Sequence, residues 1–219
     1  MSFLTSYISA NSRNFISGAA VAWANRVPAN SVPIGSLQWF DLGSVEPVLM
    51  RSDGVNWKIT APCVLINDTA ASAGVNSTSE QIIKQIVIPG DLLFACNFVS
   101  VSHLLSKVGV NAAVQPIQYR LGNAGTLLDS SIYLSNSWGT AAHLSHSGGV
   151  LINYGGAAAV NRFVSSINFS IETGGSVVNG YPIQTLVSDL SLDSYLSLTV
   201  TALSALDLVS SNRFTLLGY

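Results

Sequence analysis

Residues 195–203, Y-L-S-L-T-V-T-A-L, decide the fold class, because apolar and hydroxyl side chains alternate along them. Leu196 and Leu198 fall on one side of an extended chain, whereas Ser197 and Thr199 fall on the other. Alternation with period two is typical of a β-strand that has one buried face and one wet face. The sequence therefore predicts a strand whose outer face carries hydroxyl groups in place of charges.

Charge is scarce along the whole chain of 219 residues, of which only 9% are Asp, Glu, Lys or Arg. Ordinary soluble domains carry about 25%. A surface of Ser, Thr and Asn suits packing against identical copies, because repeating it around an axis accumulates no electrostatic repulsion. The net charge is −2 and the basic residues are scattered singly, so we expect no nucleic acid as a partner. We interpret the chain as an assembly component before an enzyme.

Many short apolar segments separated by Gly and Asn turns predict an all-β protein with a β-sandwich. A small β unit precedes it, with strands at 36–42, 47–52 and 55–60, the last two joined by an Asp53-Gly54 hairpin turn. Residues 91–94 are expected to form a short helical turn. The strands predicted in the sandwich cover 81–88, 97–103, 117–121, 131–134, 163–171, 196–203 and 213–217.

This pattern divides the chain into four parts. We predict an N-terminal anchoring arm and linker over 1–34, the small β unit over 35–66, a second linker over 67–79 and the sandwich over 80–219. Residues 1–24 are expected to form either a short helix, since Phe15, Ala19 and Trp23 recur every four residues, or an extended arm. Residues 15–24 look like a signal-peptide core, but we expect them to stay in the working protein. No apolar run reaches the about 18 residues of a membrane span.

Several segments resemble proteins of bacteriophage particles. The residues E-Q-I-I-K-Q-I-V-I-P-G-D-L-L (80–93), Y-R-L-G-N-A-G-T-L-L-D (119–129) and the closing strands over 197–219 resemble trimeric jelly-roll knobs of phage fibres. The stretches 32–43 and 48–58 are similar to the small β unit found before such knobs in tail and head appendages. The resemblance implies a jelly-roll β-sandwich, a homotrimer, other virion proteins as partners and a place on the virion. It leaves open whether the knob binds a host receptor or decorates a capsid.

The arm is the predicted virion attachment device. It carries large apolar side chains and is separated from the sandwich by Pro28 and Pro33. Leaving such side chains in water forgoes roughly 1.5–3 kcal/mol each, so we expect them to dock on another virion protein while the sandwich folds without them. The attachment residues selected on this ground are Phe3, Tyr7, Phe15 and Trp23.

Two further sets of contact residues are predicted. Hydroxyl and amide side chains on one face of the strands at 163–171 and 196–203 would let three copies approach an axis closely, which selects Asn168, Ser170, Thr199 and Thr201 as the trimer interface. Trp138 lies among small polar residues in S-N-S-W-G-T and, with Asn136 and Asn153, is the candidate receptor contact, with a host-surface glycan as one expected partner. Trp39 and Trp57 alternate within strands and are expected to pack in a core or an interface.

The sequence signals no reaction chemistry. The acids are spread thinly, and no G-x-S-x-G, phosphate-binding or dinucleotide-binding motif is present. His143-x-x-His146 has metal-like spacing but lies in what we expect to be a polar loop without a third ligand. Cys63 and Cys96 are expected to be buried thiols, and a disulfide between them stays open. We therefore expect no catalytic residue, metal or cofactor, with a monomeric carbohydrate-binding β-sandwich and a capsid decoration or head-fibre protein as the alternatives to a host-binding appendage.

Overall fold

The computed structural model describes residues 15–43, 46–109, 117–135, 143–153, 161–163, 184–186, 189–202 and 204–219. These residues form fourteen strands and three short 3-10 helices, and no α-helix occurs among them. The all-β prediction is confirmed. Within the same residues, no helix is long and apolar enough to cross a lipid bilayer.

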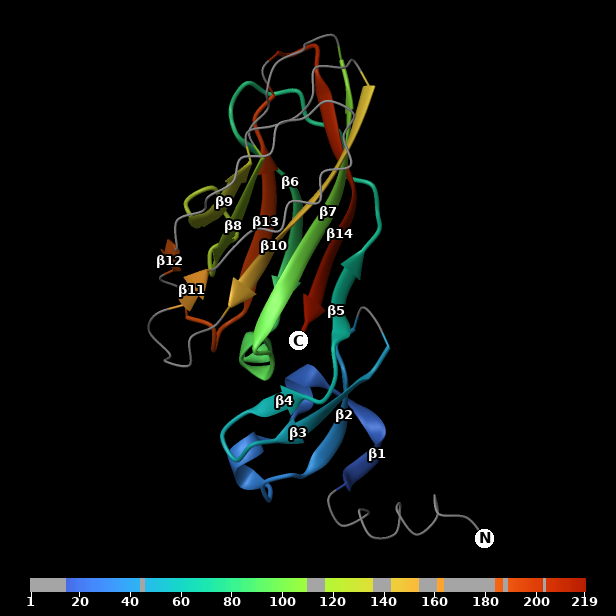
Figure 1. The fold of residues 1–219 in the computed structure, drawn as a ribbon, viewed down its shortest axis with the longest axis vertical. Coiled ribbons are helices and arrows are strands. Elements are labelled where there is room, and N and C mark those ends of the chain that lie inside the picture. The colour runs from blue at the N-terminus through green and yellow to red at the C-terminus, as the bar shows by residue number, and fades with distance from the viewer. Residues whose placement is uncertain are drawn as a thin grey trace, which may run out of the picture.

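A small four-stranded sheet occupies the N-terminal part (Figure 1). Its order is β1 (Phe15–Ala22), β2 (Leu37–Asp41), β3 (Val48–Ser52) and β4 (Trp57–Ile59), with β1 parallel to β2 and the other pairs antiparallel. The 3-10 helices η2 (Trp23–Asn25) and η3 (Ala29–Ser31) lie between β1 and β2. Gly54 takes a φ of +92° in the turn between β3 and β4, a left-handed conformation that favours glycine.

The remaining strands form two antiparallel sheets. The six-stranded sheet has the order β12-β11-β10-β7-β14-β5, and the four-stranded sheet has the order β6-β13-β8-β9. The 3-10 helix η4 (Leu92–Ala95) connects β6 to β7, where the sequence predicted a helical turn. The bounds are β5 Cys63–Asp68, β6 Gln81–Ile88, β7 Phe98–Val108, β8 Ile117–Gly122, β9 Ser130–Ser135, β10 His143–Asn153, β11 Asn161–Phe163, β12 Gln184–Leu186, β13 Ser194–Val200 and β14 Leu208–Gly218.

Strand pairing in these two sheets is nested. The outermost pair along the chain is β5 with β14, followed inward by β6 with β13, β7 with β10 and β8 with β9. Two further pairings, β7 with β14 and β8 with β13, join these hairpin-like pairs into sheets. The last strand, β14, therefore lies between β5 and β7.

The two sheets pack face to face as a β-sandwich, and their shared interior is apolar. Tyr119 of β8 stacks on Phe214 of β14, with ring centroids 6.1 Å apart, and both side chains are fully buried. Leu198 of β13 and Leu216 of β14 are also fully buried. The apolar half of the alternation in 195–203 thus faces the core, as the sequence predicts.

The hydroxyl half of that alternation was predicted to be wet, and this is wrong. Ser197 and Thr199 have no exposed surface. The Gln85 side chain donates a 2.9 Å hydrogen bond to the Ser197 hydroxyl, and the Thr199 hydroxyl donates to the carboxylate of Glu80. Neighbouring polar side chains therefore cover this face, and hydroxyl groups are favourable there because each has a partner.

Polar contacts from three residues join the small sheet to the sandwich. The indole N–H of Trp23 donates to the carbonyl of Gly90 at 2.9 Å, and Arg26 forms an ion pair with Asp91. A third contact is made by Lys58 of β4, whose ammonium group donates to the carbonyl of Phe94 in η4. We call this set the seam. Figure 1 shows the small sheet at one end of the sandwich, next to η4 and the C-terminus.

Strand positions differ from the sequence prediction in several places. Residues 15–22 form β1, where a helix or a free arm was expected, because they pair with β2. β5 belongs to the six-stranded sheet, so the expected boundary at residue 66 falls inside a strand, and Val75 in the expected linker pairs with Val209. Residues 143–149, expected as a polar loop, lie in β10 (His143–Asn153), which pairs with the full length of β7.

Candidate functional site

The small sheet buries aromatic side chains on one face. Phe40 of β2 is fully buried between Trp23 and Trp57, with ring centroids at 5.2 Å and 5.0 Å and steep interplanar angles of 79° and 69°. Edge-to-face contacts of this kind are favourable because the ring edge is positive and the ring face is negative. The Trp57 indole N–H donates to the carbonyl of Val27 at 2.8 Å, and that of Trp23 reaches Gly90, so both buried N–H groups are satisfied.

Trp39 lies on the opposite face of the same sheet. Successive side chains of a strand point to opposite faces, so the burial of Gln38 and Phe40 places Trp39 outward, directly across from Leu49 of β3. The Trp39 side chain is half-buried. Its indole N–H has no hydrogen-bond partner among the described residues, in contrast to those of Trp23 and Trp57.

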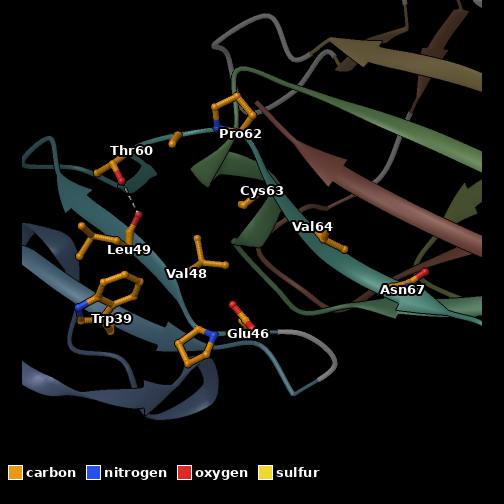
Figure 2. A pocket seen from close by; sticks show the side chains of 11 residues that line it. Trp39, Glu46, Val48, Leu49, Thr60, Pro62, Cys63, Val64 and Asn67 are labelled. Atoms are coloured by element: carbon orange, nitrogen blue, oxygen red, sulfur yellow. Dashed lines mark hydrogen bonds between the residues drawn. The ribbon is translucent and has the colours of Figure 1, made fainter.

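A groove of about 600 Å³ runs from Trp39 to strand β5. Figure 2 shows its residues coming from two units: Trp39, Val48 and Leu49 from the small sheet, and Cys63, Val64 and Asn67 from β5. The apolar lining is completed by Pro47, Ala61 and Pro62, and the polar lining by Glu46 and Thr60.

The polar groups of the groove are only partly used by the protein. Thr60 donates its hydroxyl to the carbonyl of Leu49 at 3.0 Å, and the side-chain carbonyl of Asn67 accepts from Thr215 at 3.0 Å. The Asn67 amide NH₂ and the Glu46 carboxylate have no partner in the described part of the chain, and both residues are exposed. The groove therefore offers two donors, an indole N–H and an amide, and one acceptor, a carboxylate, around an apolar floor.

Cys63 lines the groove as a free thiol. Burial raises the pKa of the Cys63 thiol, so it is protonated at neutral pH and is a poor nucleophile. Cys96 is also free and only 3% exposed, and burial raises its pKa to about 12. The two thiols are unpaired in this structure, so no disulfide bond lines the groove.

Two ion pairs of the sandwich hold its strands together. Arg120 of β8 forms a two-pronged contact with Glu80, with both N–O distances 2.7 Å. The hydrogen bonds from Arg120 hold the pKa of Glu80 below its usual value, with a further contribution from the Thr199 hydroxyl. Lys84 pairs with Asp68 at 2.9 Å, which ties β6 of one sheet to the end of β5 in the other.

A second polar group is buried between the sheets. Lys107 of β7 approaches Asp207 at 4.0 Å, and both side chains are fully buried. His103, four residues earlier on the same strand, shares a hydrogen bond with the hydroxyl of Tyr119. Because a buried charge is costly without a partner, these contacts are needed for the fold and do not line an open pocket.

The predicted attachment residues are placed in part. Trp23 lies in the core of the small sheet at 4% exposure, so its expected role in docking on a virion protein is corrected: the indole is already covered by Phe40 and hydrogen-bonded to Gly90. Phe15 begins β1. Phe3 and Tyr7 lie outside the described residues.

The predicted trimer and receptor residues are also placed in part. Thr199 is buried within its own chain and donates its hydroxyl to Glu80, so it does not present that group to a neighbouring copy. Thr201 is half-buried, and Asn153 is the last residue of β10, opposite Phe98 of β7. Asn168, Ser170, Trp138 and Asn136 lie outside the described residues, as do the contacts predicted for them.

The groove was not found by sequence reasoning, which placed Trp39 in a core or interface. The signal was present in Q-W-F, where Trp39 and Phe40 must point to opposite faces of a strand. The sequence does not show which of these two faces is covered by other residues of the chain. The structure shows that the segment from η2 to η3 covers the Phe40 face, leaving Trp39 beside β5.

Comparisons with known proteins give little further guidance. No protein-family model matches the chain, and no curated protein matches it. Among solved structures, the chain is similar to the CBM2 module of the evolved Dit of Lactobacillus casei BL23 phage J-1, with a TM-score of 0.35 and 8% sequence identity, covering 74% of this chain and 81% of that chain. A similarity this distant assigns neither a family nor an activity to the chain.

Proposed function

We propose that this chain is a structural subunit of a bacteriophage virion. In this proposal it forms a homotrimeric fibre- or spike-type appendage, whose N-terminal part attaches to the particle and whose β-sandwich knob faces outward to contact the host surface. The resemblance of residues 32–60 and 80–219 to phage appendage proteins supports this function, as does the scarcity of charge. The proposal includes no catalysis, metal or cofactor.

The proposed form of the knob is a jelly roll. A jelly roll has eight strands in two sheets, which arise when one long antiparallel hairpin is rolled up. The nested pairing supports this, because β5 pairs with β14, β6 with β13, β7 with β10 and β8 with β9. Strands β11 and β12 extend one sheet beyond β10.

The observation that carries the assembly proposal is an apolar end of the sandwich. Strand β7 starts at Phe98, next to η4 and the seam, and has 11 residues. At about 3.3 Å per residue, its last residue, Val108, lies at the opposite end. There Val108 pairs with Leu208, and Leu206 is close in sequence, with exposed fractions of 51%, 47% and 72%. Contiguous exposed apolar side chains mark interaction surfaces, and we assign this end to contacts between copies.

Mass in solution tests the proposal. Light scattering behind size-exclusion chromatography of the full chain at micromolar concentration should give three times 23.0 kDa, about 69 kDa. A Leu206→Asp substitution should shift the mass toward the monomer, because a charge would be buried at the interface. Val55→Asp is the matched control, since Val55 is equally exposed but lies in the turn of the small sheet. A monomer of 23.0 kDa from the unmodified chain would contradict the proposal.

A further inference from the structure

The groove between Trp39 and β5 has the composition of a ligand site. Its volume of about 600 Å³ lies within the range of about 300–1,000 Å³ that small-molecule sites occupy. Three polar groups at its rim, the Trp39 indole N–H, the Glu46 carboxylate and the Asn67 amide NH₂, have no partner among the described residues. The other two tryptophans of the small sheet are buried and hydrogen-bonded through their indole N–H, whereas Trp39 is half-buried, and its ring lines the groove.

The lining excludes most ligand classes. No Lys or Arg lines the groove and Glu46 is acidic, so a phosphate or another anion would be repelled. A purely apolar ligand would take the Glu46 carboxylate and the indole N–H out of water without replacing their hydrogen bonds. An extended peptide needs a row of backbone partners, whereas Pro47 and Pro62 lack the N–H that such a row requires.

A sugar ring meets the remaining requirements. It combines an apolar face of C–H groups, suited to an aromatic ring and prolines, with hydroxyl groups that both donate and accept hydrogen bonds. We propose that the groove binds a neutral saccharide, with one ring lying on the Trp39 indole and its hydroxyl groups bonded to Glu46 and Asn67. Glu46 accepts a hydrogen bond from one hydroxyl, and the Asn67 amide donates one to another.

The groove lies between the small sheet and β5, so it is a site additional to the host contact proposed for the knob. It rests on the proposed function only for its biological setting, because a saccharide is a component of bacterial surfaces that an appendage would contact. The mass measurement tests the trimer and a saccharide-binding measurement tests the groove, so either proposal can fail without the other.

Binding is tested with the full chain on a microarray of neutral and anionic oligosaccharides that also carries proline-rich peptides. We expect binding to neutral oligosaccharides, and titration calorimetry with the best of them should give a Trp39→Ala variant at least about tenfold weaker binding, because the stacking surface and a donor are lost together. Leu128→Ala, at an equally apolar but fully exposed position outside the groove, should bind as the unmodified chain does. Binding to no neutral oligosaccharide, or to anionic glycans or peptides instead, would overturn the proposal.

Two measurements keep the test decisive if Trp39→Ala lowers the melting temperature. Glu46→Ala and Asn67→Ala change exposed side chains and should fold normally, yet each should weaken binding several-fold. Alkylation of Cys63, the only groove thiol, should slow in the presence of the bound oligosaccharide. Unchanged affinity in both variants, or unchanged alkylation under saturation, would place the ligand elsewhere and refute this site.

Discussion

Replacement of Trp23 tests whether residues before Pro28 belong to the core of the small sheet. The Trp23 side chain is 4% exposed and contacts Phe40 edge-on at 5.2 Å. Truncating a buried Trp to Ala costs about 3–5 kcal/mol of stability. The indole N–H bond to Gly90 is included in that loss, and Trp23→Phe removes this bond while keeping most of the apolar surface.

The expected loss for Trp23→Phe is smaller. A neutral hydrogen bond contributes about 1 kcal/mol net. The Arg26 guanidinium lies 4.4 Å from the Trp23 ring centroid, and weakening that contact adds about 0.5–1 kcal/mol. We therefore expect Trp23→Phe to destabilise the protein by about 1–2 kcal/mol and Trp23→Ala by about 3–5 kcal/mol.

Urea unfolding followed by tryptophan fluorescence and by far-ultraviolet circular dichroism measures both variants. Val55→Ala serves as the control because Val55 is 74% exposed, and a surface change of this kind stays within about 0.5 kcal/mol. A chain that starts at Val32 lacks β1, η2 and η3, and should lose the fold of the small sheet. Stability of Trp23→Ala within about 1 kcal/mol of the unmodified chain, or a folded small sheet without residues 1–31, would refute the reasoning and restore the interpretation of this region as a detachable arm.

Three further predictions concern the sandwich and the thiols. Glu80→Gln should destabilise the protein at pH 7 by about 1–3 kcal/mol. Arg120 lowers the pKa of Glu80, so the stabilisation from the ionised carboxylate is lost as the pH falls through the pKa of Glu80 in the folded state, and the substitution should then cost less. An equal loss at pH 7 and pH 3 in urea unfolding would count against this. Asp129→Ala should lower the unfolding free energy by about 1–3 kcal/mol, measured by thermal unfolding, because its carboxylate accepts three backbone N–H bonds of the β8–β9 loop. Iodoacetamide at pH 9 followed by mass spectrometry should label Cys63 well before Cys96, whose pKa is about 12 and whose side chain is buried; equal labelling would contradict the placement.

Local signals predicted those strands whose sequence alone determines their conformation. The Asp53-Gly54 turn located the hairpin of β3 and β4, and β6 was predicted with its observed bounds because Pro89 and Gly90 follow it. Strand β10 was missed, since H-L-S-H-S-G-G carries no apolar alternation. It forms because 11 residues pair with β7, a long-range interaction that propensity does not contain.

The covered face of a sheet is likewise a tertiary property. The helical spacing of Phe15 and Trp23 suggested a helix over 1–24, but pairing with β2 draws residues 15–22 into a parallel edge strand. The same misplacement made Trp23 an attachment residue. Similarly, Thr199 was assigned to a trimer axis from alternation alone, whereas Glu80 is already there to accept its hydrogen bond.

The location of the groove follows from how the small sheet is closed. The segment from η2 to η3 packs over Phe40 and buries one face of the small sheet. The opposite face, with Trp39 and Leu49, would be left to water if the sheet stood alone. Only three residues separate β4 from β5, so this face lies beside an edge strand of the sandwich, and the groove lies between them. The Trp39 side chain at this junction is half-buried and is not covered by another element of the small sheet, so its ring stays accessible to a ligand in the groove.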